Sequence, residues 1–331
     1  MQVLDSAAAS EIALWADHAK RLPPFNAAQF ASERADVHLY AVSAGGDAEA
    51  RCSLWWNRVP ASQQHRVGVI GHYASSSYEA AELLLAAATE RLRAARCTIA
   101  IAPMNGNTWR SYRFVVERGD HPPFFMEPSN PPEWPLQFEK SGFSPLAWYF
   151  SALNSDLSRD DPRLDAMEQK IAAAGVVIRS ANSDLGSELA AIYSVSRVSF
   201  RNNFLYTEIP EAEFRAMYEP VLPVARPELV LIAERDGQCV GYLFAIPDFA
   251  QRARGVAVDT FIIKTVSTLP APELRGLGSL LVARAQQIGH RLEFRRCIHA
   301  LMFEDNTSLK ISRHYASVMR KYALYAKALA T

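Results

Sequence analysis

The spacing of apolar and polar positions predicts one series of elements that occurs twice along the chain. Each series begins with a hairpin of alternating apolar and polar residues around Gly-Gly or Asp-Gly, followed by an apolar strand. A long helix, a short strand, a second helix and a closing strand complete the series. The first series lies at 38–58, 66–73, 78–95, 98–104, 108–116 and 143–152, and the second at 229–247, 257–266, 275–292, 297–303, 307–318 and 320–328. The last segment would also suit a helix.

Other segments complete the outline. Helices are predicted at 7–20, 183–199 and 211–218. The proline-rich residues 121–135 are expected to form at most an ordered loop or a lid. Mixed sheets with helices on both faces belong to the α/β or α+β class, which is the fold class that the pattern predicts.

The repetition is also visible in the residues themselves. Residues 90–112 read ERLRAARCTIAIAPMNGNTWRSY and residues 290–312 read HRLEFRRCIHALMFEDNTSLKIS, each with Arg-Cys before an apolar strand and Asn-Thr. Chance agreement is the alternative, but the shared order of elements favours a repeat. Residues 154–164 are polar, charged and contain proline, as linkers do. We therefore expect one domain at 1–153 and a second at 165–331.

Composition excludes several classes of function. Hydrophobic residues make up 49% of the 331 residues and charged residues 21%, which is ordinary for a globular protein. Lys and Arg together number 35, as do Asp and Glu, so the zero net charge gives no electrostatic reason to expect nucleic acid as a partner. No apolar run approaches the roughly 18 residues of a membrane span, and the N-terminus lacks a signal-peptide pattern. We expect a soluble, cytoplasmic protein.

The four cysteines agree with that expectation. Cys52, Cys97, Cys239 and Cys297 form no C-x-x-C pair, so the sequence offers neither a metal knuckle nor a redox motif. Each lies in or beside an apolar strand, where a small thiol packs well. We expect free thiols in a reducing compartment and no bound metal.

The stretch IIKTVSTLPAPELRGLGSLLVARA, residues 262–285, carries the clearest chemistry. A β-branched strand and a proline-containing turn lead into a helix that starts with Arg275, Gly276, Leu277, Gly278 and Ser279. Glycine keeps the first helical N–H groups accessible, and these groups favour an anion together with the helix dipole. The third glycine of a dinucleotide fingerprint and the Gly-Lys-Ser/Thr of a P-loop are missing. The pattern predicts a diphosphate site; the alternative is that the glycines only allow close helix–strand packing.

This stretch resembles the acetyl-CoA motif of the Gcn5-related N-acetyltransferases (GNATs), Gln/Arg-x-x-Gly-x-Gly/Ala after the fourth strand. Gly276 and Gly278 match the glycines of that motif. Glu273 stands at the Gln/Arg position, and Arg275 would supply the positive charge instead. The strand and helix of residues 298–322 resemble the next motif of the family. In that motif an Asn bonds the pantetheine arm and a Tyr faces the thioester sulfur.

The resemblance implies a fold and a set of cofactor contacts. Asn306 matches the pantetheine-binding Asn, and Tyr315 matches the Tyr by type, two residues later than the usual spacing. The backbone of Thr265 and Val266 would bond the pantetheine at a bulge of the strand. The implied fold is two tandem GNAT-like domains, each a mixed, mostly antiparallel sheet flanked by helices. The second domain would hold acetyl-CoA or another acyl-CoA.

Acyl transfer to an amine needs a group that accepts a proton and a group that donates one. We expect Tyr315 to protonate the departing thiolate and Glu304 to accept the proton of the amine. A packing tyrosine and a solvated carboxylate are the alternatives. A backbone N–H near Val266 is the expected donor to the oxyanion. His299, in mid-strand, is expected to be a satisfied core histidine.

The first domain departs from the cofactor motif. Its equivalent residues, 71–85, lack both Gly-x-Gly and Arg, and Glu79 and Glu82 would repel a diphosphate. We therefore expect this domain to bind CoA poorly or not at all. Its aromatic residues either pack in the core or line an acceptor pocket between the domains: Trp55, Trp56, Trp109, Tyr112, Phe124, Phe125 and Trp134.

The expected activity is transfer of an acetyl or longer acyl group from acyl-CoA to a small-molecule or peptide amine. Two alternatives stay open. The first is a non-catalytic acyl-CoA-binding or regulatory protein, and the second is a long-chain acyl or aminoacyl transferase on the same scaffold. The sequence leaves the acceptor, the acyl length and any oligomerisation open.

Overall fold

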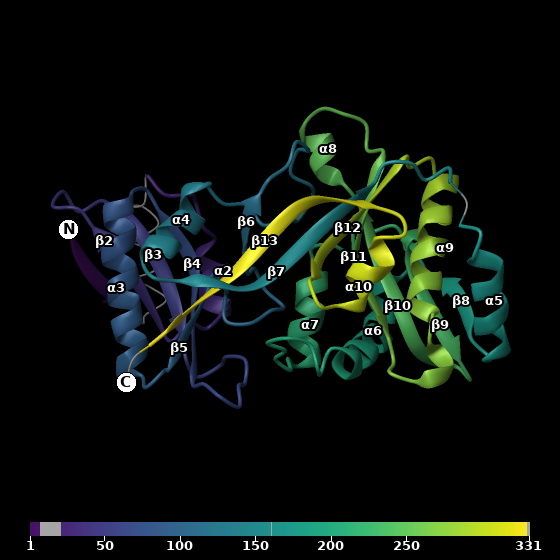
Figure 1. Cartoon of the computed structure of the whole chain (residues 1–331), viewed down its shortest axis with the longest axis horizontal. Coiled ribbons are helices and arrows are strands. Elements are labelled where there is room, and N and C mark those ends of the chain that lie inside the picture. Colours follow the sequence, from purple (N-terminus) through teal and green to yellow (C-terminus); the bar gives the residue numbers. More distant parts are fainter. Residues whose placement is uncertain (7–20, 160, 330–331) are drawn as a thin grey trace.

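The computed structural model describes residues 1–6, 21–159 and 161–329, which form one 13-stranded sheet with helices on both faces (Figure 1). The N-terminal half contains β1 (Gln2–Ser6), α2 (Ala27–Ser32), β2 (Val37–Val42), β3 (Ala48–Trp55), β4 (Val67–Ser75), α3 (Tyr78–Ala94), β5 (Ile99–Ala102), β6 (Phe114–Glu117), α4 (Glu133–Lys140) and β7 (Ser144–Asn154). The expected helix at 7–20 lies outside the described residues.

The C-terminal half repeats much of this order. It contains α5 (Leu164–Ala173), β8 (Val177–Ser180), α6 (Leu185–Ser199), α7 (Glu211–Tyr218), η1 (Pro227–Leu229), β9 (Val230–Arg235), β10 (Gln238–Pro247), α8 (Phe249–Ala253), β11 (Thr260–Thr268), η2 (Pro272–Leu274), α9 (Leu277–Arg291), β12 (Arg296–Phe303), α10 (Thr307–Ser312) and β13 (Ser317–Ala328). The expected helices at 183–199 and 211–218 and the hairpin at 229–247 are confirmed as α6, α7 and β9–β10. No helix in the described part of the chain is long and apolar enough to cross a membrane.

The strands lie in the order β1-β2-β3-β4-β5-β13-β7-β12-β11-β10-β9-β8, and β6 pairs with β13. The pairs β4–β5 and β11–β12 are parallel, and the other neighbouring strands are antiparallel. In each half the long helix between the two parallel strands, α3 or α9, packs on the sheet through its apolar face. This is the usual connection of a parallel pair, because parallel strands need a crossover.

The two halves exchange their closing strands. β7 ends beside β12 of the C-terminal half, and β13 ends beside β5 of the N-terminal half. Between these ends the two strands pair with each other, from Ser317 opposite Leu153 to Ala326 opposite Ser144. In Figure 1 the yellow β13 and the teal β7 cross together from one half to the other. The sheet is therefore continuous, and each half completes it with a strand of the other.

Two expected helices need correction. Residues 108–116 form turns and the start of β6, because Asn105 N–H bonds Ser111 O and Arg113 N–H bonds Pro103 O. The helix expected at 307–318 ends at Ser312, because pairing with β7 begins at Ser317. The strand expected at 320–328 is confirmed, and it is longer than expected.

Candidate functional site

The parallel strands β11 and β12 separate partway along their length. Their pairing stops at Ile263 opposite His299, after which β11 pairs only with β10 and β12 only with β7 among the described strands. Lys264 is an extra residue of β11 at this point, so the strand bulges against β10. β12 also shifts register against β7 directly after His299. The inner edge of β11 beyond the bulge therefore presents backbone groups with no neighbouring strand.

The start of α9 lies beside this opening. Gly276 adopts the left-handed conformation, with φ of 102° and ψ of −12°, which glycine adopts without strain. No side chain within the described ranges caps the helix, and its first internal hydrogen bond joins Leu280 N–H to Gly276 O. The N–H groups of Leu277, Gly278 and Ser279 therefore have no partner within the helix and create a positive end. This arrangement can hold an anion such as a diphosphate.

Cations from other elements surround the start of α9. Lys170 on α5 donates to Arg275 O at 2.8 Å, and its Nζ would lie 3.9 Å from a Cβ placed on Gly276. Arg235 on β9 lies 3.0 Å from Glu273 and balances its negative charge. Arg275 itself is exposed. Sequence reasoning missed Lys170, and nothing in the local pattern of α5 marks it.

Gly278 faces the gap between three elements. A Cβ placed on Gly278 would lie 3.5 Å from Ile311 of α10 and 3.8 Å from Val266 of β11. Val266 packs on the α9 side of the sheet, whereas Thr265 hydrogen-bonds Tyr218 of α7 on the other side. The structure thus brings Gly278 and Val266 together and directs the Thr265 side chain to the opposite face.

Tyr315 lies just beyond α10 and is held by the segment that was expected to be a linker. Its hydroxyl donates to Asp161, and Arg163 donates to the same hydroxyl at 3.2 Å. Burial raises the pKa of Tyr315, and the bond to the Asp161 carboxylate raises it further. The bond from Arg163 holds the pKa of Asp161 well below its ordinary range. The sequence gave no sign of this contact, because the partners lie about 150 residues apart.

Glu304 and Asn306 lie at the end of β12. One carboxylate oxygen of Glu304 accepts from Trp148 N–H at 2.9 Å, and Glu304 N–H donates to Trp148 O at 3.1 Å. Glu304 therefore fixes the end of β12 against β7. Asn306 is the N-cap residue of α10, and its exposed side chain makes no capping bond. Its amide is thus free to contact a ligand.

His299 is not the satisfied core histidine that was expected. Its Nδ1 lies 2.9 Å from the Ser312 hydroxyl, but its buried Nε2 has no hydrogen-bond partner among the residues that the structure describes. Burial lowers the pKa of His299 to about 4, so the ring is neutral at ordinary pH. A buried polar atom without a partner is uncommon, and this one occurs where β11 and β12 separate.

The corresponding place in the N-terminal half is closed. Met104 N–H bonds Ile70 O at 2.9 Å, and His72 N–H bonds the Asn105 side chain at 2.9 Å, so both bonds join β4 to the chain after β5. A Cβ on Gly71 would lie 2.1 Å from Met104 O, which requires glycine there. The Ser77 side chain caps α3 by accepting from Ala80 N–H. These contacts support the expectation that this half binds CoA poorly.

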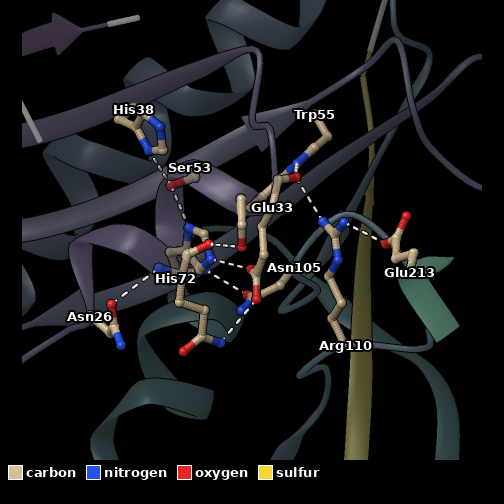
Figure 2. A network of polar contacts seen from close by, with 11 residues as sticks. Asn26, Glu33, His38, Ser53, Trp55, His72, Asn105, Arg110 and Glu213 are labelled. Carbon is tan, nitrogen blue, oxygen red and sulfur yellow. Dashed lines mark hydrogen bonds and ion pairs between the residues drawn. The ribbon is translucent and has the colours of Figure 1, made fainter. Parts of the chain in front are cut away.

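A buried polar network occupies the N-terminal half instead (Figure 2). Ser53 lies between two histidines, 2.6 Å from His38 Nδ1 and 2.8 Å from His72 Nδ1. His72 Nε2 lies 2.5 Å from Glu33, and Arg110 links Glu33 O to the Glu213 carboxylate on α7. Both nitrogens of His72 are engaged within the protein, so we assign the network a structural role.

This network predicts a loss of stability in acid. Burial, with a smaller contribution from His72, lowers the pKa of His38 to about 4 from its ordinary value of 6.5. The unfolded chain binds this proton first as pH falls, so the stability due to neutral His38 is lost between pH 6.5 and about 4. Between pH 7.5 and 5, the free energy of unfolding, measured with urea, should fall by about 2 kcal/mol more in the wild type than in His38→Asn. The exposed His121→Asn should behave like the wild type, and equal pH dependence in all three would contradict the assignment.

The aromatic residues of the N-terminal half pack individually. Trp109 packs against Phe214 of α7, and its ring N–H donates to Thr207 O at 2.7 Å. Trp55 and Trp134 are buried and donate to Glu33 O and Ser75 O. These contacts favour the packing alternative for those three residues.

Known structures share this architecture. A tandem GNAT protein from the clavulanic acid biosynthesis pathway is 13% identical, with a TM-score of 0.53 over 100% of this chain and 99% of that protein. The chain has a tandem GNAT fold. A GNAT from Sphaerobacter thermophilus matches with a TM-score of 0.50 and 14% identity, over 99% of this chain and 96% of its own. The expected fold class is thereby confirmed.

Two further matches extend the comparison. The tandem GNAT fold also matches the glucosamine N-acetyltransferase region of a fungal multi-domain β-N-acetylglucosaminidase, with a TM-score of 0.56 and 14% identity over 98% of this chain and 38% of that one. A bacterial ceramide synthase of Caulobacter vibrioides is 25% identical over 221 residues, which is 65% of this chain and 57% of the relative. The chain thus spans little more than half the length of this curated relative. No family model matches the sequence.

Proposed function

We propose that this chain transfers an acyl group from acyl-CoA to an amine and that its C-terminal half holds the acyl-CoA. The observation that carries the proposal is the separation of β11 from β12 beside the uncapped start of α9. The diphosphate would lie against the N–H groups of Leu277, Gly278 and Ser279, with Lys170 and Arg275 as cations. The pantetheine would contact the backbone of Thr265 and Val266 and the side chain of Asn306.

The chemistry requires one bond to form and one to break. The amine nitrogen attacks the thioester carbonyl, the C–S bond breaks, and CoA departs as a thiolate. A backbone N–H near Val266 would donate to the oxyanion, and Tyr315 would protonate the thiolate. The Tyr315 hydroxyl must first break its hydrogen bond to Asp161. Glu304 remains a candidate to accept the proton of the amine, although one of its oxygens is already bonded to Trp148.

The sequence relative favours a lipid-like acceptor. A ceramide is an amide of a fatty acid and a long-chain amino alcohol, so a ceramide synthase that joins the two forms an N-acyl bond. The match to the bacterial ceramide synthase covers 65% of this chain. We therefore propose a long-chain amine as the acceptor class and a long-chain acyl-CoA as the donor.

Turnover with matched donors and acceptors tests this proposal. Acetyl-CoA and a long-chain acyl-CoA are each combined with a small amine, a peptide amine and a long-chain amino alcohol, and CoA release and amide formation are measured. We expect amine-dependent CoA release, fastest with the long-chain pair, and a decrease of roughly 10- to 100-fold in Tyr315→Phe. Binding of acyl-CoA without release in any combination would indicate a non-catalytic binding protein. Absence of binding would refute the assignment of the site.

A further inference from the structure

Lys264 is the extra residue at the bulge where β11 leaves β12. Ile263 and Val266, on either side of the bulge, pack on the α9 side of the sheet. The Thr265 side chain hydrogen-bonds Tyr218 on the opposite side of the sheet. The Lys264 ammonium contacts Met126 O in the proline-rich loop, and the neighbouring Phe125 packs in the same apolar cluster as Tyr218. Lys264 therefore projects from the opening on the face opposite α9.

The ammonium of Lys264 is crowded but weakly bound. Its contact with Met126 O is long, at 3.4 Å, and is open to solvent. In the part of the chain that the structure describes, no carboxylate forms a salt bridge with it. Glu127, whose charge acts on Lys264, is already engaged by Arg320 at 2.8 Å and by Tyr322 at 2.5 Å. A side chain that is surrounded by protein yet open at its tip is typical of the wall of a recess.

The surroundings of Lys264 favour its neutral form. Burial, with a smaller contribution from Arg113, lowers the pKa of Lys264 to about 8, while Glu127 acts in the opposite direction. Arg113 is held in place by a 3.0 Å bond to Leu301 O on β12, across the opening from Lys264. At a pH near 8, a substantial fraction of Lys264 is therefore an uncharged amine that can take up a proton.

We propose that Lys264 is the group that accepts the proton of the attacking amine. This inference rests on the proposed acyl transfer. The amine nitrogen forms its bond to the carbonyl carbon and becomes positively charged, and its proton then passes to the neutral Lys264 Nζ. The C–S bond breaks, the electron pair leaves with the thiolate, and Lys264 returns the proton to water. Lys264 is favoured over Glu304, because Glu304 is bonded to Trp148 at the far end of β12.

Substitutions of Lys264 distinguish proton acceptance from an effect of its positive charge alone. Lys264→Met and Lys264→Arg are expected to lower kcat by roughly 100-fold with little change in acyl-CoA affinity, because Arg keeps the charge but does not release its proton. In the wild type, activity should rise with pH with a midpoint near pH 8, because Lys264 must lose its proton to act, and this rise should disappear in both variants. An acceptor amine of low pKa should restore part of the rate in Lys264→Met. The exposed Lys140→Met on α4 is the control and should match the wild type.

Three results would overturn the role of Lys264. The first is full activity of Lys264→Arg with an unchanged pH profile. The second is loss of the rise in activity near pH 8 in Glu304→Gln but not in Lys264→Met. The third is an acyl group found on Lys264 after incubation with acyl-CoA alone, because that would make Lys264 a nucleophile.

A measurement without turnover distinguishes failure of this inference from failure of the proposed function. The chain is labelled with acetic anhydride at a series of pH values, and the extent of labelling of Lys264 and Lys140 is measured by mass spectrometry. We expect Lys264 labelling to rise with a midpoint near pH 8, and Lys140 in the same samples is the comparison. A midpoint equal to that of Lys140 would overturn the inference even in an active enzyme. Absence of turnover with every amine, together with a low midpoint, would refute the acyl transfer instead.

Discussion

Replacing Gly278 by Glu is expected to weaken acyl-CoA binding by at least about 100-fold, because an unpaired like charge at a binding surface costs several kcal/mol. The new carboxylate would stand among the N–H groups that open α9, where it would take the place of the diphosphate and repel it. A Cβ at Gly278 itself meets only ordinary contacts, 3.5 Å from Ile311 and 3.8 Å from Val266. The protein should therefore stay folded while losing the ligand.

Two control variants isolate the cause. Gly278→Ala adds the Cβ without the charge and should weaken binding only slightly. Gly45→Glu adds the same charge in the exposed turn between β2 and β3 and should leave binding unchanged. Calorimetric titration with acyl-CoA measures the affinities, and thermal unfolding checks the fold. Wild-type affinity in Gly278→Glu would place the diphosphate elsewhere.

Replacing Glu127 by Gln is expected to lower the free energy of unfolding by about 3 kcal/mol, because it leaves a buried guanidinium without its counter-charge. Glu127 and Arg320 lie 2.8 Å apart with side chains that are 2% and 4% exposed. Arg320 also donates to the carbonyl oxygens of Arg118, His121 and Pro122. The pair thus fastens the proline-rich loop to β13, and this loop should become more sensitive to proteolysis in the variant.

The adjacent strand residue provides a matched control. Lys321 lies 3.1 Å from Glu117, but their side chains are 27% and 68% exposed. Solvent screens such a pair, so Glu117→Gln should change the unfolding free energy by less than about 1 kcal/mol. Urea unfolding of both variants measures the difference. Equal effects would show that burial of the Glu127 pair does not determine its strength.

Local periodicity explains which parts of the fold the sequence predicts. Hairpins, α9 and the repeated order of elements follow from spacings of two and 3.6 residues, which depend only on neighbouring positions. The strand exchange could not be predicted in this way, because the residues of 144–154 and 317–328 indicate strands but do not specify which neighbouring strands they pair with. The prediction of a helix at 108–116 was wrong for a similar reason. Bonds from Asn105 and Arg113 override the local preference there.

The candidate site likewise contains residues that the sequence indicates and residues that only the folded chain brings to the site. Gly276 and Gly278 could be recognised from the sequence as candidate site residues, because the effect of glycine at the start of a helix depends only on neighbouring positions. Lys170 and the Asp161 contact to Tyr315 come from other elements and become visible only once the chain is folded. Lys264 had a weak signal that was overlooked, since it is a charged residue within the otherwise apolar start of a strand, IIKTV.

The exchange of β7 and β13 also constrains how the chain is made. β13 follows every other strand in the sequence, yet it supplies the partner that β5 needs. The N-terminal half therefore cannot complete its sheet while the C-terminal half is still being translated, in contrast to proteins whose domains fold one after another on the ribosome. Until then β5 has an open edge in the nascent chain, and such an edge favours pairing with other chains. Shielding of this edge during synthesis would therefore reduce wrong pairing of the nascent chain.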